Sequence, residues 1–466
     1  MSNKPDPPRL ELSEDEMRRV GYRVVDLLVQ HFAGMREAPV GAKGKPEELH
    51  ARFAGDPPEA PTDPHELVAR LESEVFPNNL HVDHPRFFAF VPGPGNYIST
   101  MADALASGFN VFNGTWLGGS AAAAMELAVI GWFRRFCGFP ETAGGLLVSG
   151  GSAANLTALH SARAAKLGDR TADATIYFSD QTHYSVERAL RVLGFAREQF
   201  RKIPSDDSFR LPMQSLREAI RADREAGLRP FCVVANAGTT NTGAVDPLPD
   251  LADLCAEEGL WLHADGAYGA AAIICERGRQ KLAGLDCVDS LSLDPHKWLF
   301  QPFECGCVLV RDAAQMKSAF QLMPEYMRDV HRNTAETNPA DYGIQLSRGF
   351  RALKVWLSIN TFGLAAFRDA ITRGFELAEF AESELRRRRN CEILSPAEMA
   401  IVAFRFGNDD ALQTRLVDLM LRDGFAFLTS TTLKGVTALR LCTINPRTTE
   451  QDIVQTIDRL ETFAAV

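Results

Sequence analysis

The sequence has no continuous run of 18 apolar residues, and residues 1–8 lack the apolar core that a secretory signal carries. We therefore expect neither a membrane span nor a signal peptide. Positive charge is also in short supply, because 50 basic residues face 60 acidic ones and leave a net charge of −10. This balance argues against nucleic acid or an anionic membrane as a general partner. A cytoplasmic protein is the expectation that follows.

Zinc-type CxxC pairs are absent as well. The nine cysteines are odd in number and mostly stand in apolar runs, as a set of reduced core thiols would. Cys305 and Cys307 share one face of a predicted strand, but nothing nearby completes a metal site. We expect reduced thiols and no bound metal.

The chain has 466 residues, of which 45% are hydrophobic, enough to bury a large core in two or three domains. Between residues 144 and 312, short β-rich runs alternate with helical stretches, which predicts an α/β fold with a mostly parallel sheet wrapped by helices. The runs are 175–179, 231–235, 260–264, 289–293 and 306–310.

Helices are expected on both sides of this region. Ser13 and Glu16 fit a capping box that opens a helix with an apolar stripe. A linker over 39–64 and a helix over 64–76 follow. Beyond the sheet we expect a long helix over 348–373, strands within 391–406 and 437–443, and a last helix from about 448.

Lys297 is the first candidate for chemistry. It follows the β-type run 290–293 and stands before Trp298, where desolvation disfavours the ammonium and leaves an amine that can attack a carbonyl. That is the chemistry of a Schiff-base lysine. The alternative is a surface lysine that packs its stem over Trp298 and Leu299.

Two upstream features favour the first interpretation. Asp265 ends the strand-like run 261–265, at the end of a parallel strand where ligand crevices lie, and a pyridinium nitrogen is a suitable partner for a buried carboxylate. Gly151 and Ser152 precede a predicted helix whose first N–H groups could hold a phosphate. Alone, that glycine-rich turn could be an ordinary loop with a serine cap. Together with Lys297, the three features predict a pyridoxal-phosphate site.

Five segments in this order resemble the group II pyridoxal 5′-phosphate (PLP)-dependent decarboxylases, in particular the aromatic-L-amino-acid decarboxylase branch. They are 149–155, 179–188, 238–240, 263–268 and 294–298, and the resemblance runs from about residue 12 to the C-terminus. It implies fold-type I, the aspartate aminotransferase-like fold, with a smaller α+β C-terminal domain. It also implies a homodimer whose chain divides into an N-terminal helical segment on the partner subunit (1–90), a PLP-binding domain (91–372) and a small domain (373–466).

The resemblance also implies roles for individual residues. Lys297 would carry the cofactor as a Schiff base, Asp265 would meet the ring nitrogen, and His183 would stack on the ring. The phosphate would be held by Gly151, Ser152 and His296, and Thr240 would face the cofactor or its substrate adduct. From residues alone, His183 could equally be a hydrogen-bonded structural histidine.

A polar stretch over 322–339 predicts a long mobile loop, of the kind that often serves as a lid. Tyr326 stands on it where the family carries a tyrosine that returns a proton to the substrate carbon. Segment 84–95 has too much proline and glycine for a regular element. In the family it lines the substrate pocket, which places Phe90, Val91 and Gly93 there, while Trp116 belongs to a segment that reaches toward the neighbouring site. Simple core packing is the alternative for 84–95.

The expected reaction converts an L-amino acid to its amine and CO2. Phe87, Phe88, Phe90 and Trp116 supply flat apolar surface, which favours an aromatic substrate. Arg86 could instead pair with the side chain of glutamate or aspartate, although we expect it to face solvent at the pocket mouth.

An aldehyde synthase, which couples decarboxylation to oxidative deamination, is the other alternative. Such enzymes often replace the loop tyrosine or the stacking histidine, and this sequence keeps both. Two departures from the family pattern remain. Asp294 stands where the animal enzymes carry asparagine and would repel a phosphate, so we leave it outside the predicted site. Gly93 is smaller than its counterpart.

Overall fold

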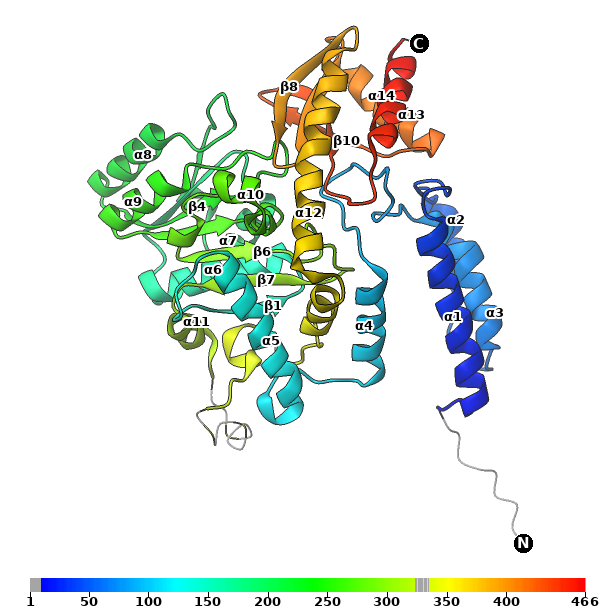
Figure 1. Cartoon of the computed structure of the whole chain (residues 1–466). Helices are drawn as coiled ribbons and strands as arrows, with labels where there is room; N and C mark the ends of the chain where they lie inside the picture. The colour runs from blue at the N-terminus through cyan, green and yellow to red at the C-terminus, as the bar shows by residue number, and fades with distance from the viewer. Residues whose placement is uncertain (1–9, 323–324, 326–329, 331–332, 334, 466) are drawn as a thin grey trace.

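A seven-stranded sheet forms the centre of the larger part of the molecule (Figure 1). The computed structural model describes residues 10–322, 325, 330, 333 and 335–465. The strands of this sheet are β1 (Gly144–Val148), β2 (Ala174–Ser179), β3 (Phe200–Ile203), β4 (Arg229–Asn236), β5 (Trp261–Asp265), β6 (Ser290–Leu293) and β7 (Gly306–Val310). Their order is β1-β7-β6-β5-β4-β2-β3, and only β7 runs antiparallel to its neighbours. The predicted mostly parallel sheet is confirmed, and β3 is a strand that the sequence analysis missed.

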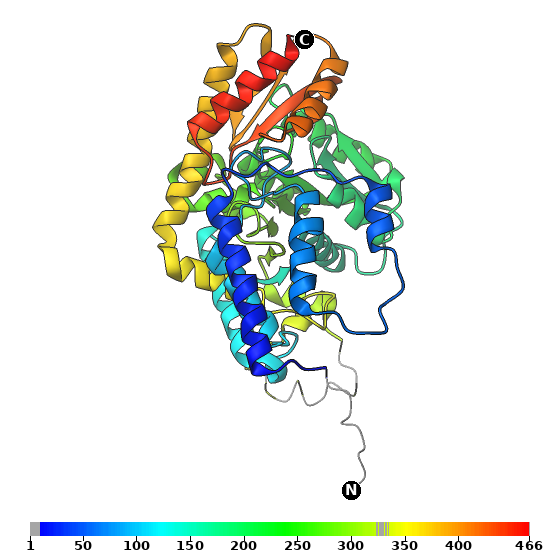
Figure 2. The same ribbon diagram turned by 90° about the vertical axis from the view of Figure 1, so that its right-hand side faces the viewer.

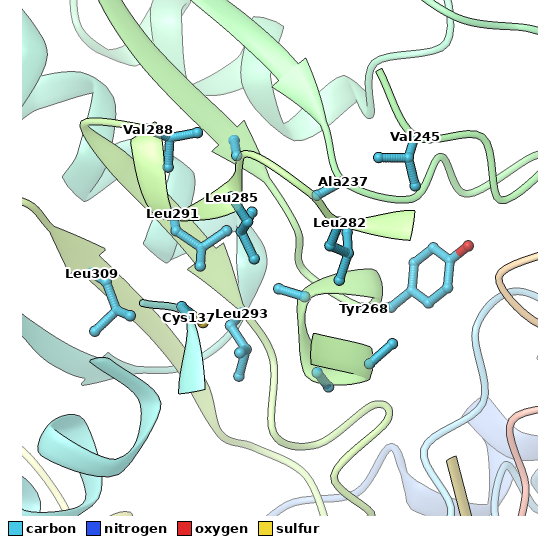
Figure 3. Packing of buried hydrophobic residues seen from close by; sticks show 14 of the residues in the cluster. Cys137, Ala237, Val245, Tyr268, Leu282, Leu285, Val288, Leu291, Leu293 and Leu309 are labelled. Atoms are coloured by element: carbon cyan, nitrogen blue, oxygen red, sulfur yellow. The ribbon is translucent and has the colours of Figure 1, made fainter. Parts of the chain in front are cut away.

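Alternate residues of these strands enter two different cores. On β2, Tyr177 joins the first core while Ile176 and Phe178 join the second. Val233 and Val234 divide in the same way on β4. Because successive side chains of a strand point to opposite faces, the sheet is buried on both sides, as parallel sheets are. Figure 3 shows part of the first core.

Helices cover both faces. The helices of this part are α4 (Tyr97–Gly108), α5 (Trp116–Phe136), α6 (Gly151–Lys166), α7 (Tyr184–Val192), α8 (Met213–Glu225), α9 (Leu248–Glu258), α10 (Glu276–Lys281) and α11 (Ala313–Phe320). Side chains of α5, α8 and α9 join the first core, and those of α6, α7 and α11 join the second. The layered α/β architecture follows from this division.

The C-terminal part is an antiparallel sheet in the order β10-β11-β9-β8, packed against helices (Figure 1). Its elements are β8 (Cys391–Glu398), β9 (Ile401–Phe406), α13 (Asp410–Asp423), β10 (Thr429–Leu433), β11 (Val436–Cys442) and α14 (Glu450–Ala464). The smaller α+β unit is therefore confirmed. Segment 84–91 also belongs to it in space, because Phe88 is part of its core.

One long helix, α12 (Ala352–Arg386), joins the two parts. It runs through the predicted boundary at residue 372 and ends 13 residues beyond the predicted helix end at 373. Its direction changes at Gly363, which has a positive φ of 75°. The large sheet and the C-terminal sheet are therefore joined by α12 itself, and no separate linker stands between them.

The N-terminal helices are α1 (Glu14–Gly34), α2 (Pro46–Phe53) and α3 (Pro64–Arg70), the last continued by short turns to Asn78. The predicted capping box of Ser13 and Glu16 is confirmed. No residue of α1, α2 or α3 is buried, and Figures 1 and 2 show α1 and α3 side by side at the edge of the molecule. The predicted linker over 39–64 contains α2, which the sequence analysis missed.

Helix α5 is the single described helix that is long and apolar enough to cross a membrane. It nevertheless packs against β1, and Glu126 on its buried face forms a 2.6 Å ion pair with Arg348. Glu126 also accepts hydrogen bonds from the Leu147 N–H of β1 and the Asn113 amide. This pair holds β1, and with it the start of α6, in place.

Replacing Glu126 by alanine should lower the free energy of unfolding by about 3–5 kcal/mol, because Arg348 would keep a buried charge without its partner. Denaturant unfolding followed by circular dichroism measures the change. Glu392→Ala is the matched control, since its pair with Arg405 lies at the surface and should contribute about 0–1 kcal/mol. Equal losses in the two variants would contradict this account of the buried pair.

Candidate active site

A cavity of about 650 Å³ lies at the carboxyl ends of the parallel strands. Loops that follow β2, β4, β5 and β6 bring His183, Thr240, Asp265 and Lys297 to it, and the start of α6 closes one side. This is the edge at which open parallel sheets bind ligands. The predicted residues Gly151, Ser152, His183, Thr240, Asp265, His296 and Lys297 all line the cavity.

The start of α6 forms a cradle for an anion. Gly150 gives the helix no side-chain cap, and the Gly151 N–H donates to the Asp294 carboxylate at 2.9 Å, which shows that an anion fits at this helix start. A Cβ atom on Gly151 would lie 2.9 Å from an Asp294 oxygen and 3.0 Å from the Ala267 Cβ. Glycine at this position therefore leaves space that any other residue would fill.

Asp265 ends β5 as a buried carboxylate with several donors. Its oxygens accept hydrogen bonds from the Asn155 amide at 2.9 Å, the Ser292 hydroxyl at 3.0 Å and the Ala267 N–H at 3.2 Å. Burial alone would raise the pKa of Asp265, but the nearby His183, His263 and Lys297 and the hydrogen bond from Asn155 hold the pKa below its ordinary value. The group is an anion set to receive a cationic partner.

A hydrogen-bond chain behind Asp265 fixes its orientation. Because a carboxylate only accepts, the Asn155 NH2 group faces Asp265 and the Asn155 carbonyl faces His263 Nε2, 3.0 Å away. His263 must therefore carry a proton on Nε2. Its Nδ1 lies 2.9 Å from the Ser290 hydroxyl. Burial lowers the pKa of His263 to about 4, so the ring is neutral and Nδ1 accepts from Ser290.

The same chain reaches His183 on the other side. The Asn155 amide also donates to Ser185 Oγ at 3.0 Å, and Ser185 Oγ lies 2.8 Å from His183 Nδ1. The Ser185 N–H donates to Nδ1 as well, so this nitrogen is an acceptor. Burial lowers the pKa of His183, although the charge of Asp265 opposes the shift. The neutral ring then keeps its N–H on Nε2.

Lys297 lies in a different environment from the one that the sequence predicts. Its Nζ is 3.1 Å from the carboxylate of Asp294, and the side chain is one-quarter exposed. The ion pair with Asp294 and this partial exposure differ from the apolar surroundings that the sequence predicts. Asp294 is buried and lines the cavity, so leaving it outside the predicted site was wrong.

Comparisons with known proteins identify the family. Residues 46–407 match the family described as "Pyridoxal-dependent decarboxylase conserved domain". This chain belongs to the pyridoxal-dependent decarboxylase family. It is 48% identical over 464 residues to an aromatic-L-amino-acid decarboxylase of Bacillus atrophaeus, covering 98% of this chain and 97% of the relative. It is 31% identical to a phenylacetaldehyde synthase of Petunia hybrida, over 94% of this chain and 92% of that protein.

Solved structures agree. A crystal structure of Oryza sativa TDC with PLP and tryptamine superposes with a TM-score of 0.92 at 29% sequence identity, covering 98% of this chain and 99% of that one. Fold-type I is therefore confirmed, and the cofactor of this decarboxylase is PLP. The cavity fits it: the glycine cradle suits a phosphate, Asp265 suits a pyridinium nitrogen, and Lys297 suits an aldehyde.

The predicted substrate residues Phe90, Val91, Gly93 and Trp116 are not among the residues that line the cavity of this decarboxylase. Phe90 is 58% exposed, Val91 packs on the large core, and the Trp116 N–H donates to the Asn338 side chain. Gly93 lies behind Phe303, since a Cβ atom there would be 2.9 Å from the Phe303 ring. Phe303 lines the cavity and was missed, because its Pro-Phe-Glu context carries no motif.

Arg86 does not face solvent at the cavity mouth, and that prediction is wrong. Its side chain is buried, donates to the Phe425 carbonyl at 2.7 Å, and lies 3.5 Å from Asp452 of α14. Phe87 and Phe88 are likewise buried beside the C-terminal sheet. Phe90 has a positive φ of 50° and is exposed, so its side chain leaves the buried side on which Arg86 and Phe88 lie.

The remaining predictions concern Tyr326 and the cysteines. Tyr326 lies outside the described residues. All nine cysteines are unbridged, and seven of them are buried, as expected. Within the ranges that the structure describes, no group of three or more His, Cys, Asp or Glu side chains could hold a metal ion.

Replacing Asn155 by leucine should reduce kcat about ten- to a hundredfold, because Asp265, His263 and Ser185 would each lose a partner and a buried unpaired group costs about 1–3 kcal/mol. Steady-state kinetics with PLP content measured by absorbance test this. Asn360→Leu, on the exposed face of α12, is the matched control and should leave kcat unchanged. Full activity at full PLP occupancy in Asn155→Leu would show that the chain has no catalytic role.

Proposed function

We propose that the protein decarboxylates an aromatic L-amino acid to the corresponding amine and CO2. The observation that carries this proposal is the 48% identity to the Bacillus aromatic-L-amino-acid decarboxylase over almost the whole of both chains. The cavity supports it, since the lysine, carboxylate and histidine that the family chemistry requires meet there.

PLP, when bound, supplies an electron sink for the electron pair that remains on the α-carbon after CO2 leaves. Lys297 Nζ is the amine that would hold the cofactor's aldehyde until the amino group of the substrate replaces it. Asp265 would keep a proton on the ring nitrogen, which its lowered pKa and its three donors favour. His183, a neutral imidazole at the cavity, would help to hold the ring, and Tyr326 or His183 would return a proton to the α-carbon.

The surroundings of the cavity favour an aromatic over an acidic substrate. Arg86, the residue that could have paired with a side-chain carboxylate, is engaged with Asp452 and Phe425. No arginine stands among the cavity-lining residues in the described ranges. Phe303 contributes an aromatic surface, while the carboxylate of Glu304 beside it is paired with Arg351 at 2.8 Å.

Purified protein supplied with PLP should release CO2 from phenylalanine, tyrosine, tryptophan or Dopa and from neither glutamate nor aspartate. A panel of the twenty amino acids plus Dopa and 2,4-diaminobutyrate, with amine products identified by mass spectrometry, provides the measurement. Lys297→Ala is the control and should lose nearly all turnover. Activity confined to glutamate or aspartate would refute the aromatic assignment.

The second candidate function is that of an aldehyde synthase, and the similarity to the Petunia phenylacetaldehyde synthase supports it. The sequence retains both His183 and Tyr326, and such synthases often lack one of them, so decarboxylation to the amine is favoured. Peroxide and ammonia measured in the same assay separate the two reactions. Peroxide formed in equal amount to CO2 would favour the synthase.

We also propose that the working unit is a homodimer. Helix α1 has no buried residue. Its exposed side chains include the apolar residues Met17, which is 55% exposed, and Val29, which is 47% exposed. Phe109 and Leu117, at the end of α4 and the start of α5, are even more exposed. Apolar surface spread over these elements is more than a monomer normally leaves uncovered, and a second copy would cover it.

Substituting Met17 and Val24 together by aspartate should convert the dimer to a monomer, because both lie on the apolar stripe of α1 and would place charge in the contact. Analytical ultracentrifugation measures the mass, and turnover should fall with dimer content. Arg19→Asp, on the opposite side of the same helix, should remain dimeric. A wild-type protein that sediments as a monomer would contradict the proposal.

A further inference from the structure

Asp294 places a carboxylate on the anion cradle itself. Its Oδ2 accepts a hydrogen bond from the Gly151 N–H at 2.9 Å and lies 3.1 Å from Lys297 Nζ. The side chain is 1% exposed. The Asp294 carboxylate therefore contacts both the first N–H of α6 and the Lys297 ammonium, the group that would hold the cofactor.

The second oxygen of Asp294 has no hydrogen-bond partner in the described part of the chain, although it is buried. Backbone surrounds it closely: a Cβ atom on Gly306 would lie 2.8 Å from Oδ1 and 2.4 Å from the Gly150 Cα. His296 Nε2 is 3.7 Å from Oδ2. Because a carboxylate only accepts hydrogen bonds, Asp294 has nothing to offer a phosphate.

We propose that Asp294 is an internal competitor of the PLP phosphate that sets the affinity of this enzyme for its cofactor. Asp294 accepts a hydrogen bond from the Gly151 N–H and pairs with Lys297, so a bound phosphate must displace or share the Gly151 contact beside a like charge. The enzyme consequently binds PLP more weakly than the same cradle would with a neutral residue at 294. This inference rests on PLP as the cofactor.

The test compares cofactor binding by cofactor-free wild type and Asp294→Asn, followed by absorbance and tryptophan fluorescence. Asparagine keeps an acceptor for the Gly151 N–H and gains a donor, so Asp294→Asn should bind PLP about tenfold more tightly, the effect of removing one moderately coupled like charge. Pyridoxal lacks the phosphate but still needs Lys297 released from Asp294, so its affinity should increase clearly less than that of PLP.

Asp294→Ser guards against a folding defect peculiar to the asparagine variant and should shift PLP affinity in the same direction. Asp253→Asn, on the exposed face of α9, removes one negative charge elsewhere and should leave both affinities unchanged. PLP affinity that is unaltered or weaker in both Asp294 variants overturns the inference, as does equal tightening of PLP and pyridoxal. Wild type that binds no PLP would overturn the proposed function together with it.

Discussion

The buried carboxylate of Asp265 is the constraint around which the rest of the site is arranged. An ion removed from water costs several kcal/mol unless hydrogen bonds and opposite charge replace its hydration. Here the donors come from α6, from β6 and from the loop after β5, so three separate segments must be in register. The parallel pairing of β5 with β6, which sets Asp265 beside Ser292, provides that register.

Satisfying Asp265 determines the state of its neighbours. The amide of Asn155 can donate to Asp265 only if its carbonyl faces His263, and this choice fixes the proton on each imidazole in turn. His183 is thereby linked to Asp265 through Asn155 and Ser185. Asp265 and His183, which both line the cavity, are held by one continuous network, and Asn155, Ser185 and His263 in it come from segments that carry the family motifs.

The sequence predicted the large sheet well because its strands are buried on both faces and read as apolar runs between helical stretches. Residues at the ends of those runs converge, since parallel strands end at one edge, and seven predicted residues line the cavity as a result. The short strand β3 and helix α2 carry little apolar signal and were missed. The predicted helix ended short of the end of α12 because the side chains of α12 pass from the core of the large sheet at Phe375 to the C-terminal core at Leu377, so no single apolar stripe continues.

The errors at the site have another origin. Arg86 and Asp294 were placed from their charge alone, with solvent or ligand as the assumed partner. In the fold, Arg86 pairs with Asp452, which is 366 residues away in the sequence, and Asp294 accepts a hydrogen bond from the backbone of α6. Contacts at that separation leave no local pattern. The same holds for exposed aromatic surface: Phe303, which lines the cavity, and Phe90 are each more than half exposed in one chain. If a second copy covers them, the wall that selects the substrate is built from two chains, and no single chain, folded or unfolded, contains the whole of it.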